Sequence, residues 1–271
     1  MKVPNTYFSK EYFLGIPYNL SMVNTGSTFS QFAFNNYREL KINGCNMALQ
    51  HNSLENDFGI LKKYYSHLCP KAIVAITLAP CVMMYRSFHQ NNGSCLSKSA
   101  IKSKIKSTLG RFNYGDITDY YPLAYSDKLA NKHISELAQG WKTLFSLANL
   151  KESNLSNENI KNIQFNTIIL SKMIAFCYSH DFVPIIVITP MSNILNQYFS
   201  DDFVNTALLN PLNKAIENSH SVHILNYRKD PQFCNHNSFY LDGGFRLSKL
   251  GSKVFMRRFL IDLKNLGYDI A

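Results

Sequence analysis

The chain has 271 residues, of which 46% are hydrophobic and 13% aromatic, enough to bury the core of one large α/β domain or two small ones. Lys and Arg outnumber Asp and Glu by 28 to 18, so the formal charge of +10 favours an anionic partner. The chain lacks a dense Lys/Arg block of the kind that binds nucleic acid, an apolar run long enough to span a bilayer, and a signal-peptide core near residue 1.

Apolar, β-rich runs alternate with longer segments of helical period, a pattern typical of a parallel sheet covered on both faces. Strands are predicted at residues 20–25, 41–48, 71–79, 183–190 and 221–227, and helices near 29–39, 53–68, 158–180, 202–219 and 248–266. The third and fourth strands are rich in Ile and Val throughout, which predicts that they are central and buried on both faces. We therefore expect a three-layer α/β/α sandwich with about five mainly parallel strands.

The first predicted strand ends at Gly26-Ser27-Thr28, directly before a helix. In a structural interpretation, Ser27 or Thr28 is an N-cap whose hydroxyl accepts a hydrogen bond from a free N–H of that helix. In a chemical interpretation, the hydroxyl lies at the carboxyl edge of the strand, beside the positive end of the helix dipole, where a developing oxyanion is stabilised. This stretch alone does not separate the two interpretations.

Residues 86–155 contain no predicted strand and are polar, Tyr-rich and Lys-rich, so we interpret them as an insertion within a single domain of residues 1–271. The insertion leaves the third strand at its carboxyl end, where open α/β sheets build their sites. Its basic residues either grip an anionic substrate or form a solvated helix face. They are Lys98, Lys102, Lys104, Lys106 and Arg111.

Polar residues also gather where the second predicted strand ends, with Asn46 in its last residues and Gln50 and Asn52 just past them. Asp242 begins a Gly-rich turn before the last helix. With Gly26-Ser27-Thr28, these stretches give the chain its likeness to a known family. From about residue 20 to residue 263, it resembles the SGNH/GDSL hydrolase superfamily. Within that superfamily it is similar to the bacterial branch of O-acetyltransferases and esterases that act on cell-surface polysaccharides. The resemblance implies an SGNH-hydrolase or flavodoxin-like form of the sandwich.

The resemblance implies that Ser27 is the nucleophile, at the place where the family usually has Gly-Asp-Ser or Gly-Ser-Ser. The family's second block supplies the oxyanion hole, and the equivalent turn here contains Asn46. The Asn of the family's third block has no counterpart, because the third strand ends in Leu-Ala-Pro-Cys at residues 78–81. Asn46, Gln50 or Asn52 is therefore expected to serve the oxyanion.

The family's Asp-x-x-His pattern before the last helix is changed in this chain. Counting from Asp242 puts Phe245 at the histidine position, and counting back from Gly251 puts Arg246 there. Neither can act as a general base, because Phe does not titrate and Arg stays protonated.

A serine nucleophile needs a base within hydrogen-bond reach, so a working Ser27 needs a substitute for the histidine. His236, six residues before Asp242, is the nearest candidate in the sequence, and His51 beside the loop after the second strand is another. Asp242 could act as the base, orient a histidine, or form an ion pair with Arg246.

The main functional hypothesis is transfer of an acyl group, foremost acetyl, through Ser27 to a sugar hydroxyl or to water. One alternative is a non-catalytic domain of the same fold that binds a glycan or a protein. Another is a different transferase of surface-polysaccharide or capsule assembly, in which Asp242 and Arg246 handle a phosphorylated sugar donor.

We expect no bound cofactor, with acetyl-CoA as a candidate co-substrate, and a carbohydrate or other anionic small molecule as the partner rather than nucleic acid. The six cysteines have no C-x-x-C pair and no zinc-ligand spacing, which indicates reduced thiols and no metal site. The default compartment is the cytoplasm, with the inner surface of the membrane as an alternative.

Overall fold

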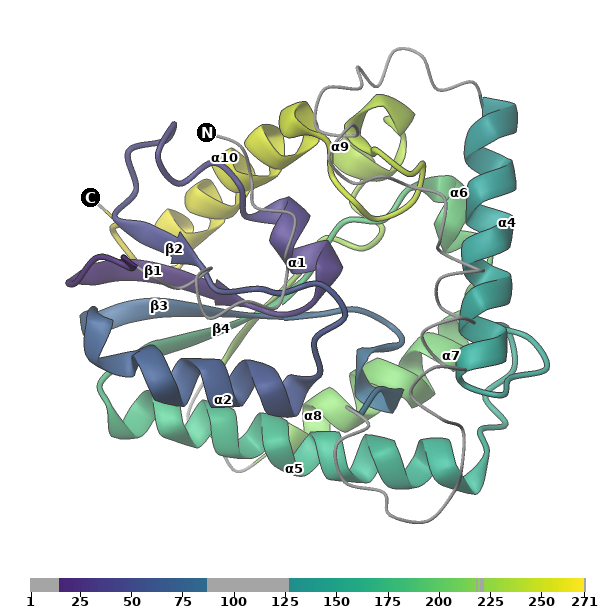
Figure 1. The fold of residues 1–271 in the computed structure, drawn as a ribbon, viewed down its shortest axis with the longest axis horizontal. Helices are drawn as coiled ribbons and strands as arrows, with labels where there is room; N and C mark the ends of the chain where they lie inside the picture. The colour runs from purple at the N-terminus through teal and green to yellow at the C-terminus, as the bar shows by residue number, and fades with distance from the viewer. Residues whose placement is uncertain (1–14, 87–126, 218, 220–221, 271) are drawn as a thin grey trace.

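The computed structural model describes residues 15–86, 127–217, 219 and 222–270. Five strands form one sheet in the order β2-β1-β3-β4-β5, and every neighbouring pair is parallel. The strands are β1 (Leu20–Thr25), β2 (Gly44–Asn46), β3 (Leu68–Leu78), β4 (Val183–Ile188) and β5 (His223–Asn226). Helices cover both faces of this sheet, which confirms the predicted three-layer α/β/α sandwich (Figure 1).

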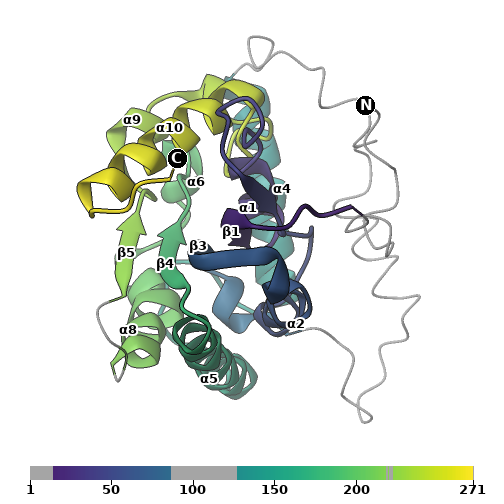
Figure 2. The same ribbon diagram turned by 90° about the vertical axis from the view of Figure 1, so that its left-hand side faces the viewer.

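The two faces of the sheet are covered by different helices (Figures 1 and 2). On one face lie α1 (Thr28–Ala33) and α10 (Lys249–Asn265), and on the other lie α2 (Leu54–Tyr64), α5 (Asn157–Ser179) and α8 (Asn210–Ile216).

Alternate side chains of β3 enter two separate apolar clusters, because successive residues of a strand point to opposite faces. Ile73 and Ala75 pack in the cluster of Phe255, whereas Val74 and Ile76 join the cluster of Leu170. This burial on both faces explains why β3 is a continuous apolar run in the sequence.

Several elements differ from the sequence prediction. The first helix ends at Ala33 rather than near residue 39, and the helix expected at 202–219 is divided into α7 (Asp201–Val204), a π-helix (Asn205–Leu209) and α8. A helix that was not predicted, α4 (Asp127–Leu144), lies in the proposed insertion. The remaining short elements are α6 (Asn193–Asn196), α9 (Pro231–Cys234) and 3₁₀ turns at Tyr65–His67, Val82–Met84 and Asn237–Phe239.

The strand order creates a switch point beside β1. The chain runs from β1 to β2 on one side and then crosses to β3 on the other side, so the connections that follow β1 and β3 diverge at their carboxyl ends. In doubly wound sheets of this order, ligands bind in the crevice outside that point. The turn containing Ser27 follows β1 directly and therefore lies at this edge.

The described part of the insertion packs at the same edge. Helix α4 approaches the turn before the last helix so closely that a Cβ on Gly243 would lie 2.7 Å from the Cβ of Ala130. The ring of Trp141, further along α4, lies 5.8 Å from the ring of Phe245. Lys98, Lys102, Lys104, Lys106 and Arg111 lie outside the described residues, so their proposed contact with substrate stays a prediction.

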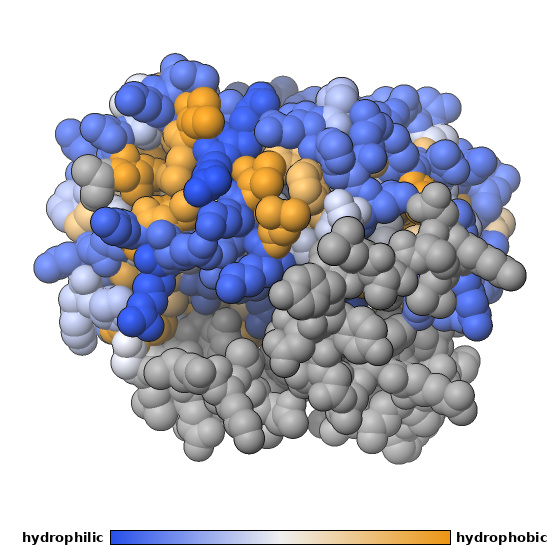
Figure 3. All heavy atoms as spheres, turned by 90° about the horizontal axis from the view of Figure 1, so that it is seen from above, coloured by the Kyte–Doolittle hydropathy of each residue, from blue (hydrophilic) through white to orange (hydrophobic). Residues whose placement is uncertain are grey.

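Where residues are described, the face of the molecule seen from above is mainly hydrophilic, with hydrophobic patches between the polar side chains (Figure 3). Exposed large apolar side chains include Leu250 and Ile261 of α10. No helix among the described residues is both long enough and apolar enough to cross a membrane. The five cysteines in the described ranges are all free thiols.

Candidate functional site

The turn that follows β1 is held from outside by two neighbouring segments. The backbone N–H of Gly26 donates to the carboxyl group of Asp57 in α2, and the Gly26 carbonyl accepts from the N–H of Leu49, 3.1 Å away. Gly26 has φ +133°, and a Cβ there would lie 2.7 Å from the Cβ of Ser30, so only glycine fits. These constraints fix the backbone on which Ser27 is carried.

Ser27 occupies the N-cap position of α1, but its side chain accepts no capping hydrogen bond. Its backbone has φ −95° and ψ −155°, and the residue is half-buried. Its hydroxyl makes no hydrogen bond to any residue that the structure describes.

Five other described helices begin after a serine, and each of those hydroxyls accepts a hydrogen bond from the backbone N–H three residues on. These serines are Ser53, Ser156, Ser192, Ser200 and Ser248. The hydroxyl of Ser27 is therefore the exception among the serine N-caps in the described part of the chain.

A buried polar network holds α1 against the sheet. The side-chain amide of Asn24 in β1 donates to the Oγ of Ser30 at 2.9 Å and to the Oδ1 of Asn46 at 2.8 Å. Its Oδ1 accepts from the hydroxyl of Tyr37 at 2.9 Å, and Ser30 donates in turn to Thr77 of β3. The network joins α1, β1, β2 and β3 next to the turn, and it supports the backbone on which Ser27 lies.

Asn46, expected at the oxyanion hole, has a structural role in this arrangement. Both hydrogens of its amide are donated to backbone carbonyls at the end of α1, those of Gln31 and Phe34, each at 2.9 Å. Such terminal carbonyls otherwise have no partner inside the helix. The arrangement leaves no amide hydrogen of Asn46 for a substrate, and its expected role at the oxyanion stays a prediction.

The other two oxyanion candidates, Gln50 and Asn52, are also buried near the turn. Asn52 donates to the carboxyl of Asp57 at 2.5 Å, so its amide supports the group that holds Gly26. Gln50 is only 3% exposed, and its Nε2 makes no hydrogen bond in the structure. Of the three amides, Gln50 is the one with an uncommitted donor.

Asp57 is a functional candidate that the sequence analysis missed. It is 3% exposed, and burial raises the pKa of its carboxyl to about 7, although the hydrogen bonds from Asn52 and Gly26 oppose this rise. An acidic residue in the first turn of a helix is usually interpreted as a solvated partner of the helix dipole. The sequence gives no signal for its burial, because that depends on how α2 docks against Gly26.

Asp242 shapes the turn before the last helix. Its Oδ1 accepts the backbone N–H groups of Gly244, Phe245 and Arg246 at 2.9, 3.1 and 3.1 Å. Its Oδ2 lies 3.7 Å from the Nε of Arg246. The carboxyl group therefore both organises the turn and faces the guanidinium, the third of the three roles considered for it.

Arg246 lies near α1 and near the loop that contains His51. The residue is 9% exposed, and its guanidinium carbon lies 5.9 Å from the centre of the Phe32 ring in α1. Its positive charge also acts on the imidazole of His51 and contributes to a lowered pKa there, although partial burial of the imidazole is the larger cause. Arg246, α1 and the loop containing His51 are therefore close together at one edge of the sheet.

The two candidate bases lie in different surroundings. His236 is exposed on the turn after α9, and its ring lies 5.0 Å from that of Phe239. None of the contacts among described residues joins His236 to Ser27 or to Asp242. His51 is also exposed, but its backbone N–H donates to the Oγ1 of Thr28, next to Ser27, at 3.3 Å.

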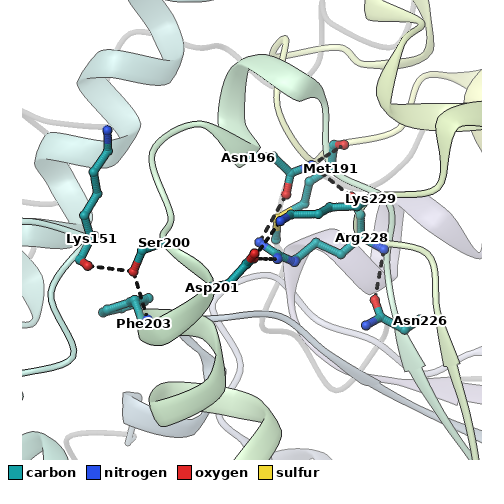
Figure 4. A network of polar contacts seen from close by, with 9 residues as sticks. All are labelled: Lys151, Met191, Asn196, Ser200, Asp201, Phe203, Asn226, Arg228 and Lys229. Carbon is teal, nitrogen blue, oxygen red and sulfur yellow. Dashed lines mark hydrogen bonds and ion pairs between the residues drawn. The ribbon is translucent and has the colours of Figure 1, made fainter.

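A second polar cluster lies past the end of β5 (Figure 4). Arg228, only 6% exposed, donates to Asp201 at 2.9 Å and to Asn196 at 3.3 Å, and Lys229 also reaches Asp201, at 2.6 Å. These two cations hold the pKa of Asp201 below its usual range. Because the donors of this cluster are directed at protein acceptors, it joins β5 to α7 rather than forming a second site.

Neither a protein-family model nor a curated protein matches this chain.

Proposed function

We propose that the protein transfers an acyl group, foremost acetyl, through Ser27 to a carbohydrate hydroxyl or to water, as the resemblance to SGNH/GDSL hydrolases implies. One observation carries the proposal: Ser27 stands at an N-cap, yet its hydroxyl makes no capping bond, whereas each of the five other serine N-caps in the described ranges makes one. The Ser27 hydroxyl makes no hydrogen bond within the described part of the protein, while neighbouring residues fix the position of its backbone. Such a hydroxyl is suited to nucleophilic attack.

Arg246 supports an anionic substrate. Arg246 is nearly buried, and its Nε lies 3.7 Å from the Oδ2 of Asp242. A guanidinium is suited to a carboxylate or phosphate, and the overall charge of +10 favours the approach of such a ligand. The proposed acceptor is an acidic saccharide of surface-polysaccharide or capsule assembly.

The proposed donor is acetyl-CoA, an anionic thioester that acts as a co-substrate rather than as a bound cofactor. Because this donor is cytoplasmic, the proposed compartment is the cytoplasm, with the inner membrane surface as an alternative. With water as the acceptor, the same site would work as an esterase.

A different observation favours a second function without catalysis. The histidine position before the last helix is occupied by Phe245 or Arg246, neither of which can act as a base, and both amide hydrogens of Asn46 are used within the fold. A domain with these features could bind an acidic glycan through Arg246, or transfer a phosphorylated sugar with Asp242 and Arg246, without an acyl-enzyme.

Trapping the acyl-enzyme tests the proposal directly. The purified chain is mixed with an aryl acetate, or with acetyl-CoA and acidic oligosaccharides, and the modified residue is mapped by mass spectrometry. We expect an acetyl group on Ser27 and none on the neighbouring Thr28.

The matched control is Ser156→Ala, which removes a working serine cap on α5 and should leave turnover unchanged. If neither an acyl-enzyme nor turnover is seen with any donor, the acyl-transfer proposal is wrong, and binding of acidic glycans becomes the function to test.

A further inference from the structure

We propose that His51 is the general base for Ser27, in place of the histidine that the last turn lacks. This inference rests on the proposed function and adds a further catalytic residue to it.

The loop containing His51 is attached to the turn that carries Ser27. Its N–H donates to Thr28 at 3.3 Å, and two residues earlier the N–H of Leu49 donates to Gly26 at 3.1 Å. The loop therefore contacts the residues on both sides of Ser27. Of the two histidine candidates, His51 alone has such a contact among the described residues.

The backbone of His51 is held in an uncommon conformation. Its φ of +55° lies in the left-handed region, which residues other than glycine seldom adopt. Strained backbone of this kind persists only where surrounding contacts enforce it, and it concentrates at functional sites. Five other described residues that are not glycine also have a positive φ, so the conformation alone does not mark a site, but at His51 it occurs together with the backbone contacts to the Ser27 turn.

The imidazole is in a state suited to accept a proton. Its ring makes no hydrogen bond to the residues that the structure describes, the Ser27 hydroxyl included, so the two groups are expected to pair only when substrate is bound. Desolvation of the ring and the charge of Arg246 both lower its pKa, which favours the neutral form of the imidazole. The other titratable group at this turn is Asp57, which is directed at Gly26 and Asn52.

The reaction step balances with these groups alone. The imidazole of His51 takes the proton of the Ser27 hydroxyl while Oγ bonds to the ester or thioester carbonyl carbon. The tetrahedral oxyanion collapses, the bond to the leaving oxygen or sulfur breaks, and the leaving group takes the proton from the imidazolium. The acceptor hydroxyl, or water, then loses a proton to His51 while its oxygen bonds to the acyl carbon. The bond from that carbon to Oγ breaks, and Oγ takes the proton back from the imidazolium, which restores Ser27 and His51.

The choice of variants follows from the backbone of His51. Asn tolerates the left-handed region better than other side chains, so His51→Asn removes the base with little added strain. Glycine adopts that region freely, and His51→Gly also leaves space for added imidazole. His236→Asn is the matched control, because it removes the rival histidine from an exposed turn.

The readouts are the rate of Ser27 labelling by a fluorophosphonate, the turnover of an aryl acetate, and the melting temperature of each variant. We expect His51→Asn to lower both rates by roughly 100-fold or more, the range typical for loss of a general base. We expect added imidazole to restore part of the rate in His51→Gly, and His236→Asn to match the wild type.

Wild-type labelling should also fall as pH drops through a midpoint below 6.5, and His51→Asn should lose this step. Because Asp57 titrates near pH 7, the profile is measured in Asp57→Asn as well, which separates the two groups.

The outcomes distinguish the role of His51 from the proposed function of Ser27. If Ser27 is labelled and His51→Asn keeps the full rate, or if His236→Asn loses it, His51 is not the base while the proposed function stands. Failure of imidazole to rescue a folded His51→Gly also counts against the assignment. If the wild type shows no Ser27-dependent reaction, the proposed function fails, and the role of His51 fails with it.

Discussion

The turns at Ser27 and Ser200 use the same residue type at the same helix position in opposite ways. The hydroxyl of Ser200 accepts from the N–H of Phe203 at 3.0 Å and donates to the carbonyl of Lys151 at 2.6 Å (Figure 4), so all its bonding serves the fold. The hydroxyl of Ser27 does neither. An N-cap serine can therefore be structural or available for chemistry, and sequence alone does not tell which.

The two turns are also held differently. The Ser200 turn is stabilised in part by its own hydroxyl, whereas the Ser27 turn is held by neighbours, through Asp57 and Leu49 on the two sides of the Gly26 peptide. The backbone ψ is −155° at Ser27 and 157° at Ser200. This comparison predicts that substitutions at the two turns change different properties.

The largest expected effect is on activity. Ser27→Ala should lower acyl transfer or ester hydrolysis at least ~10³-fold, because loss of a nucleophile removes the covalent route. The aryl acetate assay measures this loss. Circular dichroism should show an unchanged fold, since the hydroxyl makes no bond to the described residues. A variant with wild-type turnover would break the distinction between the two serines.

The second prediction concerns the group that holds the Ser27 turn. The folded-state pKa of Asp57 is about 7, above its usual value, so the folded protein binds this proton more tightly than the unfolded chain does. Protonation of Asp57 therefore contributes to the free energy of unfolding. This contribution is complete below about pH 4 and is lost as the pH rises toward 7, at roughly 1 kcal/mol per pH unit.

Urea unfolding at pH 5, 6, 7 and 8 measures the effect of Asp57. The free energy of unfolding should fall with pH in the wild type more steeply than in Asp57→Asn, where this group no longer titrates. Equal slopes in the two proteins would show that Asp57 is not the buried acid that holds Gly26.

The core of the fold could be predicted from the sequence because buried strands appear there as apolar runs. The run at residues 20–25 matches β1, and the apolar runs at 71–79 and 183–190 correspond to the central strands β3 and β4. Helix α4 was missed because it lies in a segment interpreted as polar, although its Ile134 and Ala138 join the apolar core and its Trp141 packs against Phe199.

The candidate site was less predictable, because its chemistry depends on partners far apart in the chain. Ser27, Asp242 and Arg246 came from motif spacing, but no pattern shows that Asn46 gives both amide hydrogens to α1. The burial of Asp57 and the influence of Arg246 on His51 likewise arise only when α2, the loop after β2 and the last turn meet.

The third prediction tests the backbone of the Ser27 turn. Gly26→Ala should cost about 2–4 kcal/mol of stability, since it combines an unfavourable positive φ with a Cβ placed 2.7 Å from that of Ser30. Gly267→Ala is the control, because Gly267 has φ +88° but nothing within 4 Å of its added Cβ. The control should cost only about 1 kcal/mol. Equal losses of unfolding free energy in the two variants would mean that the contact between the added Cβ and Ser30 does not destabilise the protein.

The smallest expected effect is on the stability contributed by each serine. Ser200→Ala leaves the N–H of Phe203 and the carbonyl of Lys151 without their partner, and loss of such a cap costs about 1 kcal/mol. Ser27→Ala removes a hydroxyl that caps nothing, so it should cost less than about 0.5 kcal/mol. Urea unfolding of both variants at one pH measures the difference. A loss at Ser27 equal to that at Ser200 would mean that the Ser27 hydroxyl caps α1 in solution, which would return this serine to a structural role.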